Sequence, residues 1–366
     1  MTSDNLQHTI AFSNTSPNIG DTVTCTSTIT NNDTAPAIFR NVFSADGIPF
    51  YTSPLQFVTT GKTVTVPSIF QTVSPGIVPI CSDPVPLHSE SLQGMQLFPP
   101  NNLWYARADT LPLDPRSAEY MASFTGDVRW YVKHPYNIVD NSVVPQYVTG
   151  IGTNSDNIPY PIPDDPLINP GGYDLVLIMI NPQTMMMYDL YHAVQNTDGT
   201  WTASSAKWFD LTSNVLRPNR RTPNFHGRVR YDELVAGVIN HAIQVTVPHT
   251  NSFIWGETTW LELHDPLLNY PPVGQRLRLK ASVNISNYPT QAKIIAQAFK
   301  TYGAIITDQH GDNYNLQFIG SPDDRWNTDW GAPELAVLHT LSVSDFEAVD
   351  CSSLMVSADS MEAKTY

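Results

Sequence analysis

Residues 270–308 read YPPVGQRLRLKASVNISNYPTQAKIIAQAFKTYGAIITD, and they show the most specific local pattern in the chain. Arg276, Arg278 and Lys280 alternate with apolar residues over 275–283, which predicts a strand with all three cations on one face. Apolar residues recur at three- and four-residue spacing after Thr290, which predicts a helix that ends at Gly303. The apolar run that follows, 304–308, predicts a buried strand.

The first 85 residues have a different character. Seven short runs rich in Thr, Val and Ile alternate with turn residues, which is the spacing of an immunoglobulin-like sandwich. Prolines at the end of this unit introduce a predicted linker over 86–94. Cys25 and Cys81 both fall in predicted strands, and two interpretations stay open: one disulfide bridge, or two separate buried side chains.

The remaining sequence predicts one larger domain over 95–356 and a tail over 357–366. The continuous apolar run 174–180 predicts a fully buried strand, and 184–191 is expected to pair back with it. Residues 200–210 and 240–247 predict further strands. We therefore expect an all-β protein, in which an immunoglobulin-like sandwich precedes a larger β-sandwich or jelly-roll domain with one short α-helix.

Composition narrows the functional classes. Hydrophobic residues make up 41% of the chain and charged residues only 14%, with 30 prolines, which favours an extracellular β-rich protein over a cytosolic enzyme. The net charge of −15 disfavours nucleic acid as a partner, although the region 217–230 is a candidate for a local basic groove. No run predicts a membrane span. The first ten residues lack a signal-peptide pattern, so we expect a trimmed leader or assembly without secretion, as in virions.

Several motifs follow one another through the larger domain. They are YDLY at 188–191, FDLTSNVLRP at 209–218, RYDELVAGVINHA at 230–242, PPVGQRLRLKAS at 271–282, AFKTYGAIITD at 298–308, GSPDDRW at 320–326 and DFEAVD at 345–350. In this order they resemble a family of uncharacterised secreted bacterial β-rich proteins. The phrase SPNIGDTVT at 16–24 resembles immunoglobulin-like repeat domains of bacterial surface proteins and some viral proteins, which act as spacers, stalks or adhesion modules. The resemblance implies an extracellular location and transfers no catalytic residue.

The charged residues of these motifs suit two kinds of glycan chemistry. Hydrolysis needs two carboxylates at a fixed separation, whereas elimination from an acidic polysaccharide needs cations and a His or Tyr that moves a proton. The candidate catalytic residues are His241, Arg278, Lys280, Tyr302, Asp308 and Glu233. The same cations also fit a solvated strand face, or ion pairs with Asp308 and Glu233 inside the protein. No residue spacing predicts a metal site or a cofactor site.

Two functional interpretations therefore remain open. In the first, the larger domain engages an extracellular polysaccharide and cleaves it on the concave face of the sandwich. In the second, the chain is a non-catalytic cell-surface or virion protein that binds glycan or neighbouring subunits. The eight tryptophans suit stacking on sugars, although core or edge packing is the better explanation for each of them when it is taken singly.

Overall fold

The computed structural model describes the backbone of the strands within 6–86, and residues 92, 95–132, 134–168, 174–217, 222–256, 269–310, 316–321 and 335–364. Side chains are described only after residue 91. The chain divides into two compact units, one that contains residues 1–89 and one that contains 90–321 and 333–366.

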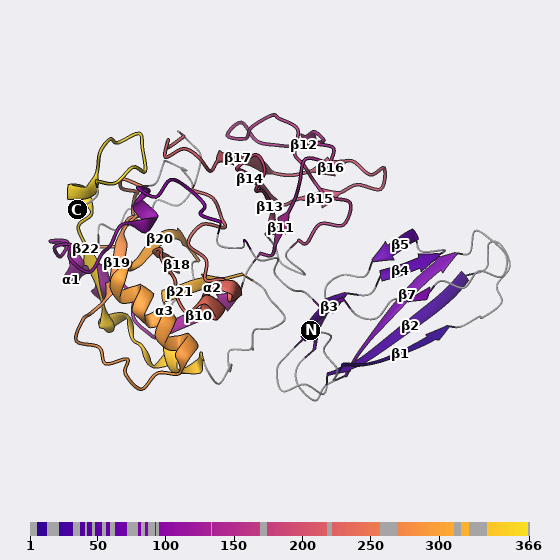
Figure 1. The fold of residues 1–366 in the computed structure, drawn as a ribbon, viewed down its shortest axis with the longest axis horizontal. Helices are drawn as coiled ribbons and strands as arrows, with labels where there is room; N and C mark the ends of the chain where they lie inside the picture. Colours follow the sequence, from indigo (N-terminus) through magenta and orange to yellow (C-terminus); the bar gives the residue numbers. More distant parts are fainter. Residues whose placement is uncertain are drawn as a thin grey trace. The chain divides into compact units, whose positions relative to one another are not determined.

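The first unit consists of short strands (indigo to violet in Figure 1). They are β1 (Leu6–Phe12), β2 (Thr22–Asn31), β3 (Ala37–Arg40), β4 (Val42–Ala45), β5 (Ile48–Thr52), β6 (Gln56–Val58), β7 (Thr63–Gln71), β8 (Ile80–Cys81) and β9 (Val85–Pro86). The described strands pair as three sheets in the orders β1-β2-β7, β6-β3-β9 and β5-β4-β8. The immunoglobulin-like arrangement stays a prediction. Cys25 lies in β2 and Cys81 in β8, but their side chains are outside the described set, so the bridge also stays a prediction.

A six-stranded mixed sheet forms one half of the larger unit, in the order β10-β21-β18-β20-β19-β22. Its strands are β10 (Val128–Val132), β18 (Ile243–Val247), β19 (Arg276–Leu279), β20 (Ala304–Gln309), β21 (Leu316–Gly320) and β22 (Phe346–Val349). The helix α3 (Thr290–Thr301) lies against this sheet (Figure 1). Phe299 of α3 is fully buried, and its ring meets the rings of Phe318 and Phe346 edge-on, at centroid distances of 5.5 and 5.4 Å. These aromatic contacts hold the helix on the sheet.

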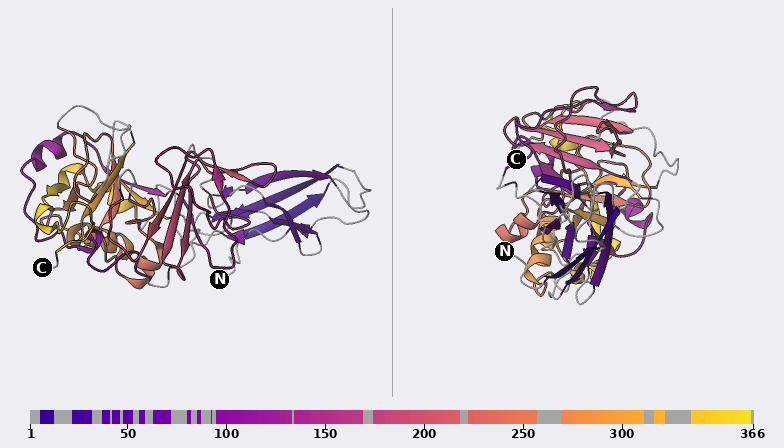
Figure 2. Two further views of the ribbon diagram at one scale, coloured as in Figure 1. Left: turned by 90° about the horizontal axis from the view of Figure 1, so that it is seen from above. Right: turned by 90° about the vertical axis from the view of Figure 1, so that its right-hand side faces the viewer.

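A second sheet, in the order β11-β13-β14-β17, forms the other half (Figure 2). Its strands are β11 (Tyr136–Ile138), β13 (Leu177–Asn181), β14 (Met186–Tyr191) and β17 (Ser205–Asp210), and beside them lie the short strands β12 (Val148–Thr149), β15 (Val194–Gln195) and β16 (Trp201–Thr202). One buried hydrophobic cluster contains Ile180 and Met187 from this sheet, and Ile305 and Val349 from the six-stranded sheet. The two halves therefore share a core.

The helix α3 and the strand predicted after it are confirmed, whereas the strand predicted over 275–283 is shorter and spans Arg276–Leu279, because residues 281–283 form a turn. The helix spans Thr290–Thr301, and the strand after it, β20, is buried over its first four residues. Gly303 separates the two with a backbone φ of +73°, and a Cβ at this position would lie only 2.3 Å from the carbonyl oxygen of Leu277. Glycine is needed here because both the left-handed backbone and the close approach exclude a side chain.

The all-β fold class is confirmed, because strands in several sheets dominate the structure and helices are few. Two further helices join α3 among the described residues, α1 (Ser117–Ala122) and α2 (Tyr231–Ala236), together with the short 3₁₀ segments η1 (Leu103–Tyr105), η2 (Ala336–Thr340), η3 (Val343–Asp345) and η4 (Ser352–Leu354). The single strand expected over 200–210 is two strands, β16 and β17, which belong to different sheets.

The segment predicted as a tail after residue 356 is part of the larger unit. Met361 and Ala363 are buried in the shared hydrophobic cluster. Isolated β-bridges join Ser360 to Val215 and Glu362 to Asn102. The segment packs because its apolar residues alternate with polar ones, a short strand-like pattern that lies against the loop before β18 and the start of the domain.

Candidate functional site

The cationic face of β19 is covered by another part of the chain. Arg276 is only 1% exposed, and its guanidinium donates to two backbone carbonyls of the segment 103–111, each 2.6 Å away. Arg278 donates to two further carbonyls of the same segment, at 2.8 Å. A guanidinium offers five N–H donors in a planar fork, which suits several carbonyls that lack partners in regular secondary structure. The two arginines therefore fasten this irregular segment to the sheet.

The other contacts of these cations are also internal. Arg278 Nε donates to Glu347 Oε1 of the neighbouring strand β22 at 2.7 Å. Lys280 Nζ donates to the carbonyl oxygen of Ser344 at 2.6 Å. The solvated strand face that was an alternative for Arg278 and Lys280 is thus wrong for Arg278, whose contacts are internal, whereas the contact of Lys280 is exposed. The alternative of an internal ion pair is correct in kind for Arg278, but its partner is Glu347 and not Asp308 or Glu233.

Tyr302 and Asp308 lie elsewhere in the same half of the unit. Tyr302 follows the last helical residue of α3, where its backbone N–H donates to the carbonyl of Ala298, and its side chain packs against the shared core. Asp308 lies near the end of β20, and its Oδ1 accepts a hydrogen bond from the Gln309 backbone at 2.7 Å. The structure gives both residues local structural roles at element ends.

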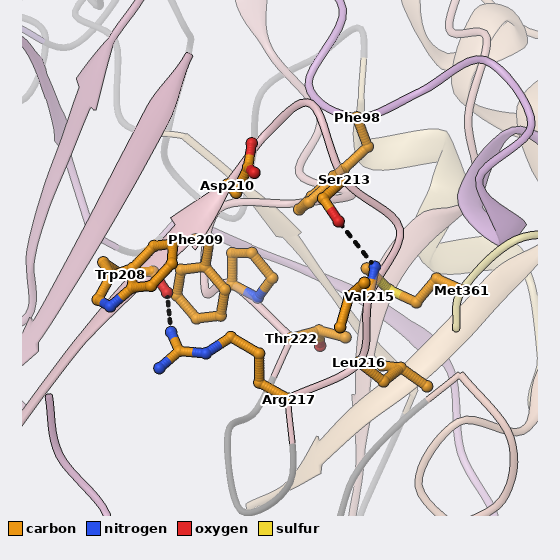
Figure 3. A pocket seen from close by; sticks show the side chains of 11 residues that line it. Phe98, Trp208, Phe209, Asp210, Ser213, Val215, Leu216, Arg217, Thr222 and Met361 are labelled. Atoms are coloured by element: carbon orange, nitrogen blue, oxygen red, sulfur yellow. Dashed lines mark hydrogen bonds between the residues drawn. The ribbon is translucent and has the colours of Figure 1, made fainter. Parts of the chain in front are cut away.

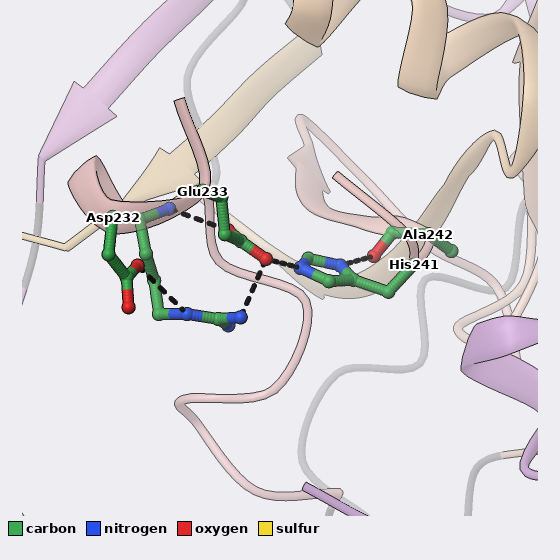
Figure 4. A network of polar contacts seen from close by, with 5 residues as sticks. Asp232, Glu233, His241 and Ala242 are labelled. Atoms are coloured by element: carbon green, nitrogen blue, oxygen red, sulfur yellow. Dashed lines mark hydrogen bonds and ion pairs between the residues drawn. The ribbon is translucent and has the colours of Figure 1, made fainter. Parts of the chain in front are cut away.

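Glu233 and His241 are brought into direct contact, although eight residues separate them (Figure 4). His241 Nε2 lies 2.8 Å from Glu233 Oε1, and His241 Nδ1 lies 2.8 Å from the carbonyl oxygen of Ala242. Arg230 Nη2 donates to the same Glu233 oxygen at 2.6 Å, and the Arg230 backbone N–H donates to Glu233 Oε2 at 2.9 Å. We call Arg230, Glu233 and His241 the Glu233 network. It begins helix α2, where Glu233 occupies the third position and caps the first turn.

Charge compensation keeps the carboxyl of Glu233 ionised inside this network. Burial opposes ionisation, but Arg230, His241 and the hydrogen bonds outweigh it, so that the pKa of Glu233 lies below its ordinary value. Both oxygens accept hydrogen bonds from within the chain, and the side chains of Glu233 and His241 are only 11% and 7% exposed. The network therefore has a structural role, because it fixes the first turn of α2 and engages both oxygens of Glu233 in hydrogen bonds within the chain.

His226, which the motifs did not single out, lies behind this network. Its ring is 2% exposed and neither nitrogen has a hydrogen-bond partner in the described structure. The rings of Phe98 and Trp104 meet it edge-on at 4.8 and 4.7 Å. Burial lowers the pKa of His226 well below 6.5, and the nearby His241 and Arg230 lower it further. His226 is therefore a neutral ring in an aromatic environment.

Tyr105 closes the same region from segment η1. Its ring centroid lies 6.0 Å from that of His226. Burial raises the pKa of Tyr105 to about 12, against the opposing effect of Arg230. At neutral pH its hydroxyl therefore stays protonated and is unsuited to act as a base.

Phe98 also lines a cavity of about 270 Å³ (Figure 3). We call it the Trp208 pocket. Its lining residues come from the start of the domain, from β17 and the loop after it, and from the end of the chain: Phe98, Trp208, Phe209, Asp210, Ser213, Val215, Leu216, Arg217, Thr222, Pro223 and Met361. Aromatic and aliphatic side chains dominate, with a few polar groups among them, which is typical of a small-ligand site.

The wall of the Trp208 pocket is fixed by an ion pair. The Arg217 guanidinium lies over the ring of Trp208, 4.3 Å from its centroid. It donates to the Trp208 carbonyl at 2.5 Å (Figure 3). It also donates to Asp156 Oδ1 at 2.6 Å. Because the guanidinium is held at three places, it orients the indole and leaves its own charge compensated.

The basic groove considered for 217–230 does not form among the described residues of that region. Arg217 pairs with Asp156, and Arg230 belongs to the Glu233 network. Arg228 is 1% exposed and donates to the carbonyls of Asn224 and His134. Residues 218–221 lie outside the described part of the chain.

Sequence reasoning found the segment that builds the pocket but not its role. The motif FDLTSNVLRP supplies Trp208's neighbours from Phe209 to Arg217, and it was recognised only as part of a family pattern. The tryptophans were considered for sugar stacking as a class, without a reason to select Trp208. The available signal is an adjacent aromatic pair, Trp208 and Phe209, followed by Arg217 later in the same motif.

The described residues contain neither a metal-binding cluster nor a membrane-spanning helix. No three His, Cys, Asp or Glu side chains in this part of the chain gather in a way that could hold a metal ion. The longest described helix, α3, has 12 residues, and no helix in the described set is long and apolar enough to cross a membrane.

Neither the scan against protein-family models nor the searches of curated proteins and of solved structures found a match for this chain. The resemblance to secreted bacterial β-rich proteins therefore stays a prediction.

Proposed function

We propose that this chain is a non-catalytic surface protein that binds a saccharide in the Trp208 pocket. The observation that carries the proposal is the composition of that pocket, in which aromatic side chains stand beside a carboxylate, a guanidinium and hydroxyl groups. A sugar ring presents apolar C–H faces that pack on aromatic rings, and hydroxyl groups that exchange hydrogen bonds with polar side chains at its edge.

The arrangement of the expected catalytic residues favours binding over cleavage. Arg278 and Lys280 contact Glu347 and a backbone carbonyl, and both oxygens of Glu233 accept hydrogen bonds from its own network. Hydrolysis needs a second carboxylate across a cleft, and Asp210 is the single carboxylate among the residues that line the described pocket. The composition supports an extracellular or cell-surface location, where such a protein meets glycans or neighbouring subunits.

A binding assay with the full chain tests the proposal. Calorimetric titration with a panel of neutral, acidic and N-acetylated oligosaccharides should find at least one ligand, and Trp208→Ala should weaken it about tenfold or more because the stacking surface is lost. Tyr147→Ala is the matched control, because Tyr147 is 63% exposed and lies outside the pocket. Its affinity should equal that of the wild type.

The same panel exposes the competing interpretation. New reducing ends, or unsaturated products, that are lost in both His241→Ala and Arg278→Ala with the fold retained would establish a glycan-cleaving enzyme. Equal affinity of Trp208→Ala and wild type would show that the saccharide does not bind in the Trp208 pocket.

A further inference from the structure

The geometry points to an uncharged N-acetylated sugar, an N-acetylhexosamine, as the ligand class of the Trp208 pocket, in preference to a uronic acid. This inference rests on the proposed function and specifies its ligand. Three properties of the pocket carry it: the charge of its lining, one carboxylate oxygen without a described donor from the chain, and an apolar wall beside the aromatic residues.

Charge argues against an acidic sugar. The cation of the pocket, Arg217, is already paired with Asp156, and the side chains of the two are 26% and 8% exposed. Asp210 then remains as the uncompensated charge among the described lining residues. A sugar carboxylate would lie near this aspartate, and like charges repel each other. The net charge of −15 on the whole chain acts in the same direction at longer range.

The hydrogen bonds of Asp210 argue for a ligand that donates. Its Oδ1 accepts from the backbone N–H and the hydroxyl of Thr212, at 2.8 and 2.6 Å. Its Oδ2 accepts no hydrogen bond from the side chains and backbone that the structure describes. An ionised carboxylate is an acceptor only, so the free oxygen suits an N–H or O–H group of the ligand. The amide N–H of an acetamido group is such a donor and brings no charge.

The apolar wall argues for a substituent as well as a ring. Phe98, Val215, Leu216 and Met361 line the cavity in addition to the aromatic residues of β17. A plain hexose would place hydroxyl groups against much of this wall and leave them without partners, which is costly. The methyl of an acetamido group has no such requirement and gains from being buried there. One substituent thus satisfies both the free oxygen and the apolar wall.

Matched ligands isolate the acetamido group. We would titrate the full chain with N,N′,N″-triacetylchitotriose, with cellotriose, with the de-N-acetylated trisaccharide and with trigalacturonate. The first two have the same linkage and length and differ at the acetamido group. We expect the acetylated sugar to bind about tenfold or more tightly than cellotriose, and trigalacturonate to bind most weakly.

Asp210→Ala has a matched control within the chain. Asp198 makes the same contacts as Asp210, since its Oδ1 accepts from the backbone and hydroxyl of Thr200 at 3.0 and 2.6 Å, but it does not line the pocket. Both substitutions remove an equivalent turn. Only Asp210→Ala should reduce the preference for the acetylated sugar, by about tenfold.

The outcomes separate the two proposals. Equal affinity for triacetylchitotriose and cellotriose, tighter binding of the de-N-acetylated sugar, or a preference for trigalacturonate would each refute the N-acetyl inference while leaving saccharide binding in place. An equal effect of Asp198→Ala and Asp210→Ala would show that Asp210 does not contribute to recognition of the acetylated sugar. Failure to bind any member of the wider panel would overturn the proposed function itself.

Discussion

Replacement of His226 by phenylalanine should make the protein less sensitive to acid. His226 is buried between aromatic rings, and neither of its nitrogens has a hydrogen-bond partner in the described structure. The charged and titratable groups around it are Tyr105, Arg230, Glu233 and His241, and burial, with help from Arg230 and His241, holds the pKa of His226 well below 6.5. The unfolded chain therefore binds a proton at this ring that the folded chain excludes.

The sign and size of the effect follow from proton linkage. Below pH 6.5 the unfolded state holds more protons than the folded state, so the free energy of unfolding falls as the pH falls. The slope approaches about 1.4 kcal/mol per pH unit while the folded state excludes the proton, which gives about 2 kcal/mol between pH 7 and pH 5. The stabilising contribution of Glu233, whose pKa is lowered, is lost only below its ordinary value of 4.5 and so lies outside this interval.

Urea titrations at pH 7 and pH 5 measure the difference. Tryptophan emission is a suitable signal, because Trp104 lies 4.7 Å from the His226 ring. Wild type should lose about 2 kcal/mol more than His226→Phe between the two pH values, whatever the absolute stability of the variant. His226→Gln, which also does not titrate, should behave like His226→Phe and controls for ring size. Equal losses in wild type and both variants would show that the folded state accepts the proton, and the reasoning would be refuted.

Two further substitutions test the packing of the larger unit. Arg276→Leu should lower the free energy of unfolding by about 2–4 kcal/mol, measured in urea, because the carbonyls of Ala106 and Leu103 each lose a charged donor and Leu103 keeps only the backbone N–H of Ala106; a loss under about 1 kcal/mol would contradict this role. Gly227→Ala should cost about 2 kcal/mol more than Gly199→Ala in the same measurement. Both glycines have positive φ, at +78° and +85°, but only at Gly227 would a Cβ meet Trp104, at 2.1 Å, so equal costs would show that the indole moves aside freely.

The spacing of apolar residues predicted those helices and strands whose buried face is set by a local sequence pattern. The helix before Gly303 and the buried strands β13 and β20 follow from runs of apolar residues. The split of 200–210 into β16 and β17 was not predictable in this way, because strand partners decide it, and those partners lie in two different sheets.

The candidate site was harder to predict for a related reason. Alternation in 275–283 correctly placed Arg276 and Arg278 on one side of a strand, but it says nothing about what covers that side. The covering segment lies 170 residues away in sequence, and it forms little regular structure, so that its carbonyls accept hydrogen bonds from the arginine side chains. Glu233 and His241, by contrast, are close in sequence, and the helical turn between them brings these two candidate residues into contact, which the sequence did not predict.

The use of arginine inside the sheet has a consequence for where function can reside. A strand face covered by irregular backbone must supply hydrogen-bond donors, and arginine supplies the most donors of any side chain. Once Arg276 and Arg278 serve that purpose, neither guanidinium of β19 is free to act on a substrate. The Trp208 pocket differs, because Asp210 retains an oxygen without an internal donor beside aromatic walls. The hydrogen bonds of these polar groups therefore favour ligand recognition at the edge of the second sheet over chemistry on the six-stranded sheet.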